Sequence, residues 1–102
     1  MAAWHPAIAL SELPAQGFKG VEVAGQALLI GRMQGRPFAW RDRCPHAGAP
    51  LRVGKLRGEE LQCPRHGWMF NLATGCSIPD DPAFHLSAVP VKIEGAEVFV
   101  EV

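Results

Sequence analysis

Short hydrophobic runs separated by turn-forming residues occupy most of the chain. The first three such runs lie at residues 20–25, 27–33 and 36–42. Gly25 and Gly35 stand between them, and glycine readily adopts the positive φ that tight hairpin turns require. The pattern therefore predicts three consecutive antiparallel strands. Pro37 cannot donate a ladder hydrogen bond, so the third strand begins there or lies at a sheet edge.

The second half of the chain predicts two further hairpins. Residues 54–63 form one around Gly58, and residues 90–102 alternate hydrophobic and polar positions across Gly95. A 3.6-residue hydrophobic repeat of helical length is missing, although residues 7–14 can hold one short turn near Ser11 and Glu12. The sequence thus predicts an all-β fold of antiparallel strands, a small sandwich or incomplete barrel with its functional loops at one end.

Composition limits the domain count and the classes of partner. The chain has 102 residues, 48% of them hydrophobic, which predicts one compact domain over residues 1–102. Ten Lys and Arg balance ten Asp and Glu, so no overall charge attracts nucleic acid or an anionic membrane. No hydrophobic run approaches the roughly 20 residues of a membrane span, and the N-terminus lacks the basic region of a signal peptide. We expect a cytoplasmic protein.

Two loops, at residues 43–52 and 62–71, carry the candidate chemistry. The first contains Cys44-x-His46 and the second, after sixteen intervening residues, Cys63-x-x-His66. Each loop offers one thiolate and one imidazole, and the hairpin at 54–63 can bring both loops to the same end of the sheet. A zinc ion also accepts two sulfur and two nitrogen ligands, but zinc motifs usually pair Cys with Cys and His with His.

The mixed pairs resemble the signature of the Rieske family, Cys-x-His followed by Cys-x-x-His, at all four positions. The resemblance implies one [2Fe-2S] cluster, with Cys44 and Cys63 on one iron and His46 and His66 on the other. Two neutral histidines in place of two thiolates leave the oxidised centre less negative, which makes the addition of an electron easier.

The residues expected around the cluster set its potential. High-potential Rieske proteins have an extra cysteine in each loop and a Ser and a Tyr that donate hydrogen bonds to the cluster. This chain has Ala49 and Arg65 in place of the cysteines, and Trp68 and Phe70 in place of Ser and Tyr. The potential should therefore fall near the low end of the family's range, about −150 mV. The residues expected to surround the ligands are Ala49, Arg65, Gly67, Trp68 and, in a covering loop at 78–82, Pro79.

The function that this resemblance implies is electron transfer without bond chemistry. A Rieske-type ferredoxin takes one electron from an NAD(P)H-dependent flavin-containing ferredoxin reductase and passes it to a terminal Rieske oxygenase that hydroxylates aromatic rings. We expect a monomer. Two alternatives stay open at this point: the small Rieske subunit of an assimilatory nitrite reductase, and a zinc-stabilised binding module.

Charged and ligand-type residues outside the motif have simpler interpretations. Residues 41–65 carry six basic and three acidic side chains, and the hypothesis is a basic rim that steers docking. Cys76 is interpreted as a small buried residue or a free thiol, not a further ligand. His5 and His85 have no cysteine at ligand spacing and are expected at the surface.

Overall fold

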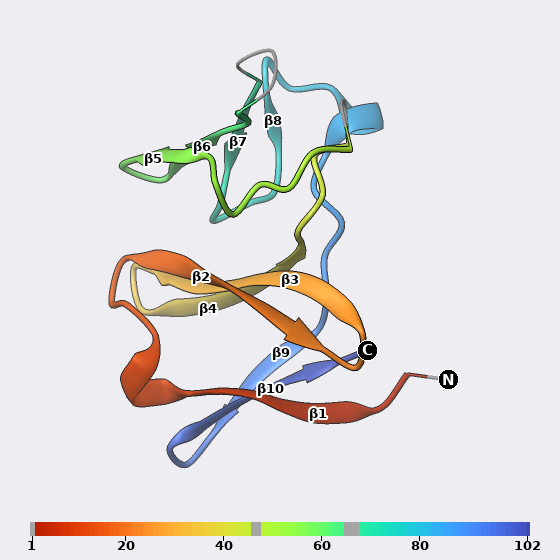
Figure 1. Ribbon diagram of the computed structural model, residues 1–102. Helices are drawn as coiled ribbons and strands as arrows, with labels where there is room; N and C mark the ends of the chain where they lie inside the picture. The colour runs from red at the N-terminus through yellow and green to blue at the C-terminus, as the bar shows by residue number, and fades with distance from the viewer. Residues whose placement is uncertain (1, 46–47, 65–67) are drawn as a thin grey trace.

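The protein is described by a computed structural model that covers residues 2–45, 48–64 and 68–102. Ten strands form three antiparallel sheets in the described part of the chain, in the orders β1-β10-β9, β2-β3-β4 and β5-β6-β7-β8. The first two sheets lie one above the other as a sandwich, and the third forms a loop unit at one end (Figure 1). The strands are β1 (Trp4–Ala9), β2 (Gly17–Val23), β3 (Gln26–Met33), β4 (Arg36–Arg41), β5 (Lys55–Arg57), β6 (Glu60–Gln62), β7 (Met69–Asn71), β8 (Ser77–Ile78), β9 (Val91–Glu94) and β10 (Glu97–Glu101).

The three strands predicted first form the central sheet. Both of its turns have two consecutive residues at positive φ, Ala24 (51°) with Gly25 (78°) and Gln34 (53°) with Gly35 (76°). Such turns match the right-handed twist of a hairpin, so each glycine fixes the register of its strand pair. Strand β4 lies at an edge of this sheet, as the proline at its second position predicts.

The terminal sheet joins the two ends of the chain. The hairpin β9–β10 turns at Gly95 (φ 59°), as predicted. Strand β1 pairs with β10, with Trp4 opposite Glu101, and its register shifts between Pro6 and Ile8. The sequence did not predict β1, because its pairing partner lies at the far end of the chain and its hydrophobic pattern is irregular. The short turn expected near Ser11 is the 3-10 helix η1 (Leu10–Glu12).

The loop unit contains the remaining predicted hairpin and two strands that the hydrophobic pattern of the sequence did not predict. The β5–β6 hairpin turns at Gly58 (φ 62°), and β7 and β8 extend its sheet. Strand β8 has two residues, too few for a recognisable alternation. After β8 the chain forms the 3-10 helix η2 (Pro82–Phe84) and returns to β9.

Two hydrophobic cores share the central sheet. Leu28 and Ile30 on β3 pack into the core between the two sheets of the sandwich, whereas Leu29 and Met33 pack into the core beneath the loop unit. Because both faces of β3 are covered, its sequence reads as a continuous hydrophobic run instead of an alternating one. The all-β, sandwich-like fold predicted from the sequence is confirmed, with the loop unit on one side of it. In the described residues, no helix is long and hydrophobic enough to cross a membrane.

Candidate metal centre

The two cysteines of the motif lie in the same core. Cys44 follows strand β4 and Cys63 follows strand β6, and their exposed fractions are 0% and 1%. Both belong to the core beneath the loop unit, together with leucines and Phe70 from the neighbouring strands. Two segments that are nineteen positions apart in the chain thus bring their thiols into one hydrophobic region.

The two cysteine loops close in the same way. The Cys44 amide donates to the carbonyl of Ala49 at 2.8 Å, and the Cys63 amide donates to the carbonyl of Trp68 at 2.6 Å. In each loop the bond joins the cysteine to the residue five positions later. Gly48, whose φ is 69°, also donates to the Cys44 carbonyl at 2.7 Å. Each cysteine is therefore held at the base of a closed backbone ring.

The buried carboxylate of Asp42 fixes the first cysteine loop by accepting hydrogen bonds from residues at the end of that loop. The side chain of Asp42 is 0% exposed and lies two positions before Cys44. Its Oδ1 accepts hydrogen bonds from the Leu51 amide at 2.6 Å and the Arg52 amide at 3.0 Å, and its Oδ2 pairs with the Arg52 guanidinium. The sequence reasoning missed Asp42, because an acid between two arginines is typical of a solvated surface. Its position at the end of a predicted strand and two residues before Cys44 is the signal that could have marked it.

Several of the predicted site residues lie outside the described residues. They are His46, Arg65, His66 and Gly67. The two-cysteine, two-histidine ligand set therefore stays a prediction.

The other predicted surrounding residues are described. Ala49 is 7% exposed and belongs to the same core as both cysteines. The ring of Trp68 packs edge-on against Phe84 of η2, with the ring centroids 4.8 Å apart. Pro79 follows a cis peptide bond and is exposed, and its carbonyl accepts a hydrogen bond from the Ser77 hydroxyl. The segment that starts at β8 and ends at η2 thus runs beside the second cysteine loop, although its role as a cover stays a prediction.

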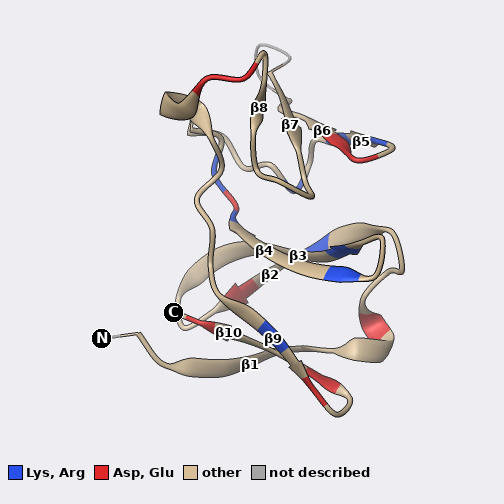
Figure 2. Ribbon diagram, turned by 180° about the vertical axis from the view of Figure 1, so that it is seen from behind, with Lys and Arg blue, Asp and Glu red and all other residues tan. Residues whose placement is uncertain are grey.

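The surface beside Cys63 is hollowed, and Lys55 is the basic residue among its described lining residues. A hollow of about 330 Å³ is lined by residues 53–55 and 62–64, which include Cys63 and Lys55. Val53 at its margin is 67% exposed. Within the predicted basic rim, Arg52 pairs with Asp42 and Arg41 bonds to Gln26 on β3, whereas Arg65 lies outside the described residues, so the rim stays a prediction. Basic and acidic positions both occur on the loop unit (Figure 2).

The donor chemistry of this region fits an iron–sulfur centre. Two thiols in a hydrophobic core, on loops of the same closure, supply the soft ligands that such a centre requires. Asp42 is bonded to the backbone and to Arg52, so it is committed to structure. Fold and site together define a β protein in which two loops at one end of a sandwich place two buried cysteines in one core.

Comparison with known proteins identifies the family. Residues 3–91 match the model of the Rieske [2Fe-2S] domain, and the chain belongs to this family. Its cofactor is one [2Fe-2S] cluster.

Similar proteins of nearly equal length are ferredoxins. The chain is 34% identical over 98 residues to the ferredoxin component of a naphthalene 1,2-dioxygenase system from Pseudomonas aeruginosa, an alignment that covers 96% of this chain and 94% of the relative. The solved ferredoxin of carbazole 1,9a-dioxygenase from Nocardioides aromaticivorans superposes with a TM-score of 0.79 at 26% identity, covering 96% of both chains. A ferredoxin solved in complex with its reduced oxygenase in carbazole 1,9a-dioxygenase gives a TM-score of 0.79 at 30% identity, covering 95% of this chain and 91% of that one.

Proposed function

We propose that this chain is the ferredoxin of a multicomponent oxygenase system. In this role it accepts one electron at a time from an NAD(P)H-dependent flavin reductase and delivers it to a ring-hydroxylating dioxygenase. The observation that carries the proposal is the pair of buried thiols on two loops of equal closure, Cys44 and Cys63, in a chain that matches oxygenase ferredoxins along nearly their whole length. The chain does not itself catalyse the oxygenation.

The proposed ligands are the two cysteines together with His46 and His66. When bound, the cluster supplies a site that gains and loses a single electron. The protein contributes by holding the two thiols in position. The hydrogen bond at the base of each loop and the Asp42 contacts hold the thiols in place, so that little of the protein needs to move when the charge changes.

The side chains near the second loop favour a low reduction potential. Trp68 and Phe70 stand where a hydroxyl donor is found in high-potential members, and Phe70 is fully buried. Hydrogen bonds to cluster sulfurs stabilise the added electron, so their loss lowers the potential. We propose a value near the low end of the family's range, about −150 mV.

The first experiment measures the cluster itself. The protein, purified without oxygen and reduced with dithionite, should give the rhombic low-temperature electron paramagnetic resonance signal of a mixed histidine and thiolate centre. Cys44→Ser should lose this signal and its iron. Cys76→Ser is the matched control and should keep both. Zinc in place of iron in the wild-type protein would leave a zinc-stabilised binding module and end the electron-transfer proposal.

The partner is tested by reconstitution. The reduced protein should support turnover by an aromatic ring dioxygenase, and it should itself be reduced by a flavin reductase with NADH or NADPH. Electron delivery to a sirohaem nitrite reductase instead would assign the chain to the alternative pathway.

The hollow beside Cys63 is the proposed docking point. Lys55 lines it, and a basic side chain there steers an acidic partner. Lys55→Glu should slow electron transfer to the oxygenase, most at low salt, because electrostatic steering is screened by ions. Lys19→Glu makes the same charge change at an exposed residue of β2 that does not line the hollow. Equal rates for both variants would contradict docking at the hollow.

We also propose that the protein acts in the cytoplasm as a monomer. The odd number of cysteines, a poor basis for a disulfide framework, supports a reducing compartment.

A further inference from the structure

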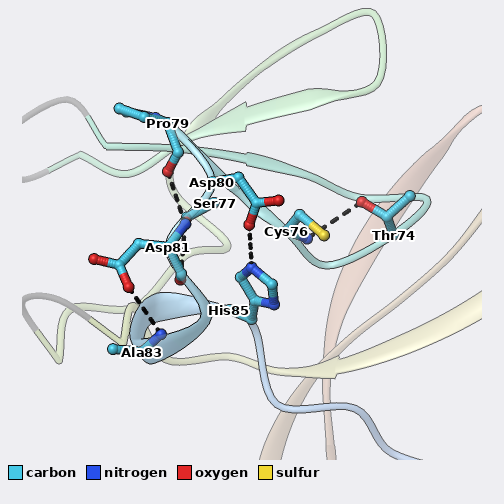
Figure 3. Close-up of polar contacts among 8 residues, drawn as sticks. All are labelled: Thr74, Cys76, Ser77, Pro79, Asp80, Asp81, Ala83 and His85. Atoms are coloured by element: carbon cyan, nitrogen blue, oxygen red, sulfur yellow. Dashed lines mark hydrogen bonds and ion pairs between the residues drawn. The ribbon is translucent and has the colours of Figure 1, made fainter.

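A second set of metal-type ligands lies in the segment that runs from the turn before β8 to the residue after η2. It contains Cys76, Asp80 and His85, whose sulfur, oxygen and nitrogen ligand atoms all lie within 4.8 Å of one another. Figure 3 shows the three side chains converging, with the Asp80 carboxylate directed at the His85 ring. Asp80 Oδ1 and His85 Nε2 are 2.5 Å apart. None of the three belongs to the Cys44 and Cys63 loops.

The backbone fixes the positions from which these side chains project. The Leu86 amide donates to the Gly75 carbonyl at 2.8 Å, which holds His85 beside Cys76 although the two are nine positions apart. The Asn71 amide donates to the Cys76 carbonyl at 2.9 Å. The three donors are therefore brought together by the backbone, not by chance contacts of long side chains.

The loop that carries Asp80 is fixed as well. The hydroxyl of Ser77, which is 1% exposed, donates to the Pro79 carbonyl at 3.0 Å, and it accepts from the Asp81 amide at 2.9 Å. The Asp81 carboxylate accepts from the Ala83 amide at the start of η2. Asp81 is thus committed to the backbone, and Asp80 is the acid of this loop that faces the histidine.

The charge of the segment suits a divalent cation. Residues 76–85 contain two acidic side chains and no Lys or Arg. A thiolate and a carboxylate together neutralise two positive charges, and the imidazole adds a neutral nitrogen donor. One sulfur, one nitrogen and one oxygen are ligands of borderline-soft Zn²⁺, which in a three-ligand protein site takes water as its fourth ligand.

Small side-chain movements are enough to accept the ion. Tetrahedral zinc with the usual bond lengths places nitrogen and oxygen ligands roughly 3.3 Å apart and nitrogen and sulfur ligands roughly 3.6 Å apart. Asp80 must therefore move away from His85, and the widest separation must close by about 1 Å. The Asp80 side chain is 70% exposed and that of His85 is 34% exposed, so both have room to turn.

We infer that Cys76, Asp80 and His85 form a binding site for a single Zn²⁺ ion, separate from the iron–sulfur centre. The bound ion ties the turn before β8 to the residue after η2. It thereby braces the segment whose Phe84 packs against Trp68 of the second cysteine loop. The proposal gives His85 and Cys76 a role beyond the surface histidine and the small buried residue or free thiol that the sequence predicts. It does not depend on the partner of the ferredoxin.

The test uses the iron-loaded protein and Zn²⁺ alone. Zinc is titrated against a competing fluorescent zinc chelator, and iron content and the paramagnetic signal are recorded on the same samples before and after. We expect one zinc per chain with the iron retained. Cys76→Ser and His85→Gln should each weaken zinc binding by more than about a hundredfold, because the loss of an outer-shell contact alone costs about 10–100-fold. Asp80→Asn should weaken it less than they do.

His5→Gln is the matched control. His5 lies on β1, and its removal should leave zinc affinity unchanged. Zinc should also raise the unfolding temperature of the wild-type protein and of His5→Gln, but not that of His85→Gln. Absence of saturable zinc binding, or equal affinity in wild type and His85→Gln, would overturn the site. Displacement of iron by zinc would do so too, because it would place the zinc in the cluster ligands. Absence of the paramagnetic signal before zinc is added would count against the ferredoxin proposal alone.

Discussion

Asp42 should contribute more to the stability of the first cysteine loop than its exposed partner Arg52 does. The Asp42 side chain is fully buried, and it is the hydrogen-bond acceptor for two amides, one of them the buried amide of Leu51. Removing an acceptor from a buried donor costs about 1–3 kcal/mol. The Arg52 side chain is 40% exposed, so solvent screens its ion pair, and an exposed pair contributes about 0–1 kcal/mol.

Three substitutions separate these contributions. Asp42→Ala removes both acceptors and the charge, and should lower the free energy of unfolding by about 3 kcal/mol. Asp42→Asn keeps an oxygen for the amides and loses the charge, and should cost about 1–2 kcal/mol. Arg52→Gln keeps a donor and should cost about 1 kcal/mol or less. For a domain of this size 1 kcal/mol corresponds to about 4–8 °C, so Asp42→Ala should unfold about 12–24 °C lower.

The assay follows far-UV circular dichroism and the visible absorbance of the cluster in one thermal scan, at one scan rate for all variants. Because Asp42 lies two positions before Cys44, the cluster absorbance should be lost at the same lowered temperature as the strands. An Arg52→Gln variant as unstable as Asp42→Ala would refute the reasoning, because the ion pair would then hold the loop. An Asp42→Ala variant whose free energy of unfolding lies within about 1 kcal/mol of that of the wild type would also refute the reasoning.

Three further substitutions test the contacts around the centre. Trp40→Phe removes the indole donor to the Leu72 carbonyl, at 2.9 Å, and should destabilise the protein by about 1–3 kcal/mol in a denaturant titration. Gly54→Ala places a Cβ 2.2 Å from a backbone carbonyl oxygen of β6, next to the second cysteine, and should cost about 3 kcal/mol and reduce the iron content. Its control, Gly58→Ala, meets no atom within 4 Å and should cost only the strain of its positive φ, about 1–2 kcal/mol, with full iron. Phe70→Tyr should raise the reduction potential in a redox titration. The rise is about 60 mV if the new hydroxyl stabilises the added electron by about 1.4 kcal/mol. An unchanged potential together with lower stability would show that the hydroxyl donates to no cluster sulfur.

The parts of the fold that were predictable have local signals. Each predicted hairpin has its own glycine turn, and the turn residues Gly25, Gly35, Gly58 and Gly95 all have positive φ. Strand β1 has no such signal, because its partner β10 lies more than eighty residues away and the pairing depends on the whole sandwich. Strand β8 is recognisable only through its pairing with β7.

The same distinction holds for the sites. Cys44 and Cys63 were predictable because ligand spacing is a local property of the chain. Asp42 was not, because what marks it is the absence of solvent around its carboxylate and its bonds to residues nine and ten positions later. Cys76 and His85 are likewise unremarkable in sequence, and only the backbone bond that pairs the residues next to them brings their donors together.

The hydrophobic core that contains both cysteines distinguishes this centre from a metal site on which folding itself depends. In a small zinc-held domain the metal supplies most of the folding free energy, because the chain has little hydrophobic core without it. Here the two cysteines lie among fully buried hydrophobic side chains of the loop unit, and residues of β3 and β4 complete the same core. The sandwich therefore positions the loop unit through β3, which is covered on both faces. A scaffold held in this way keeps its shape when the charge at the two thiols changes by one unit. An electron carrier requires this property.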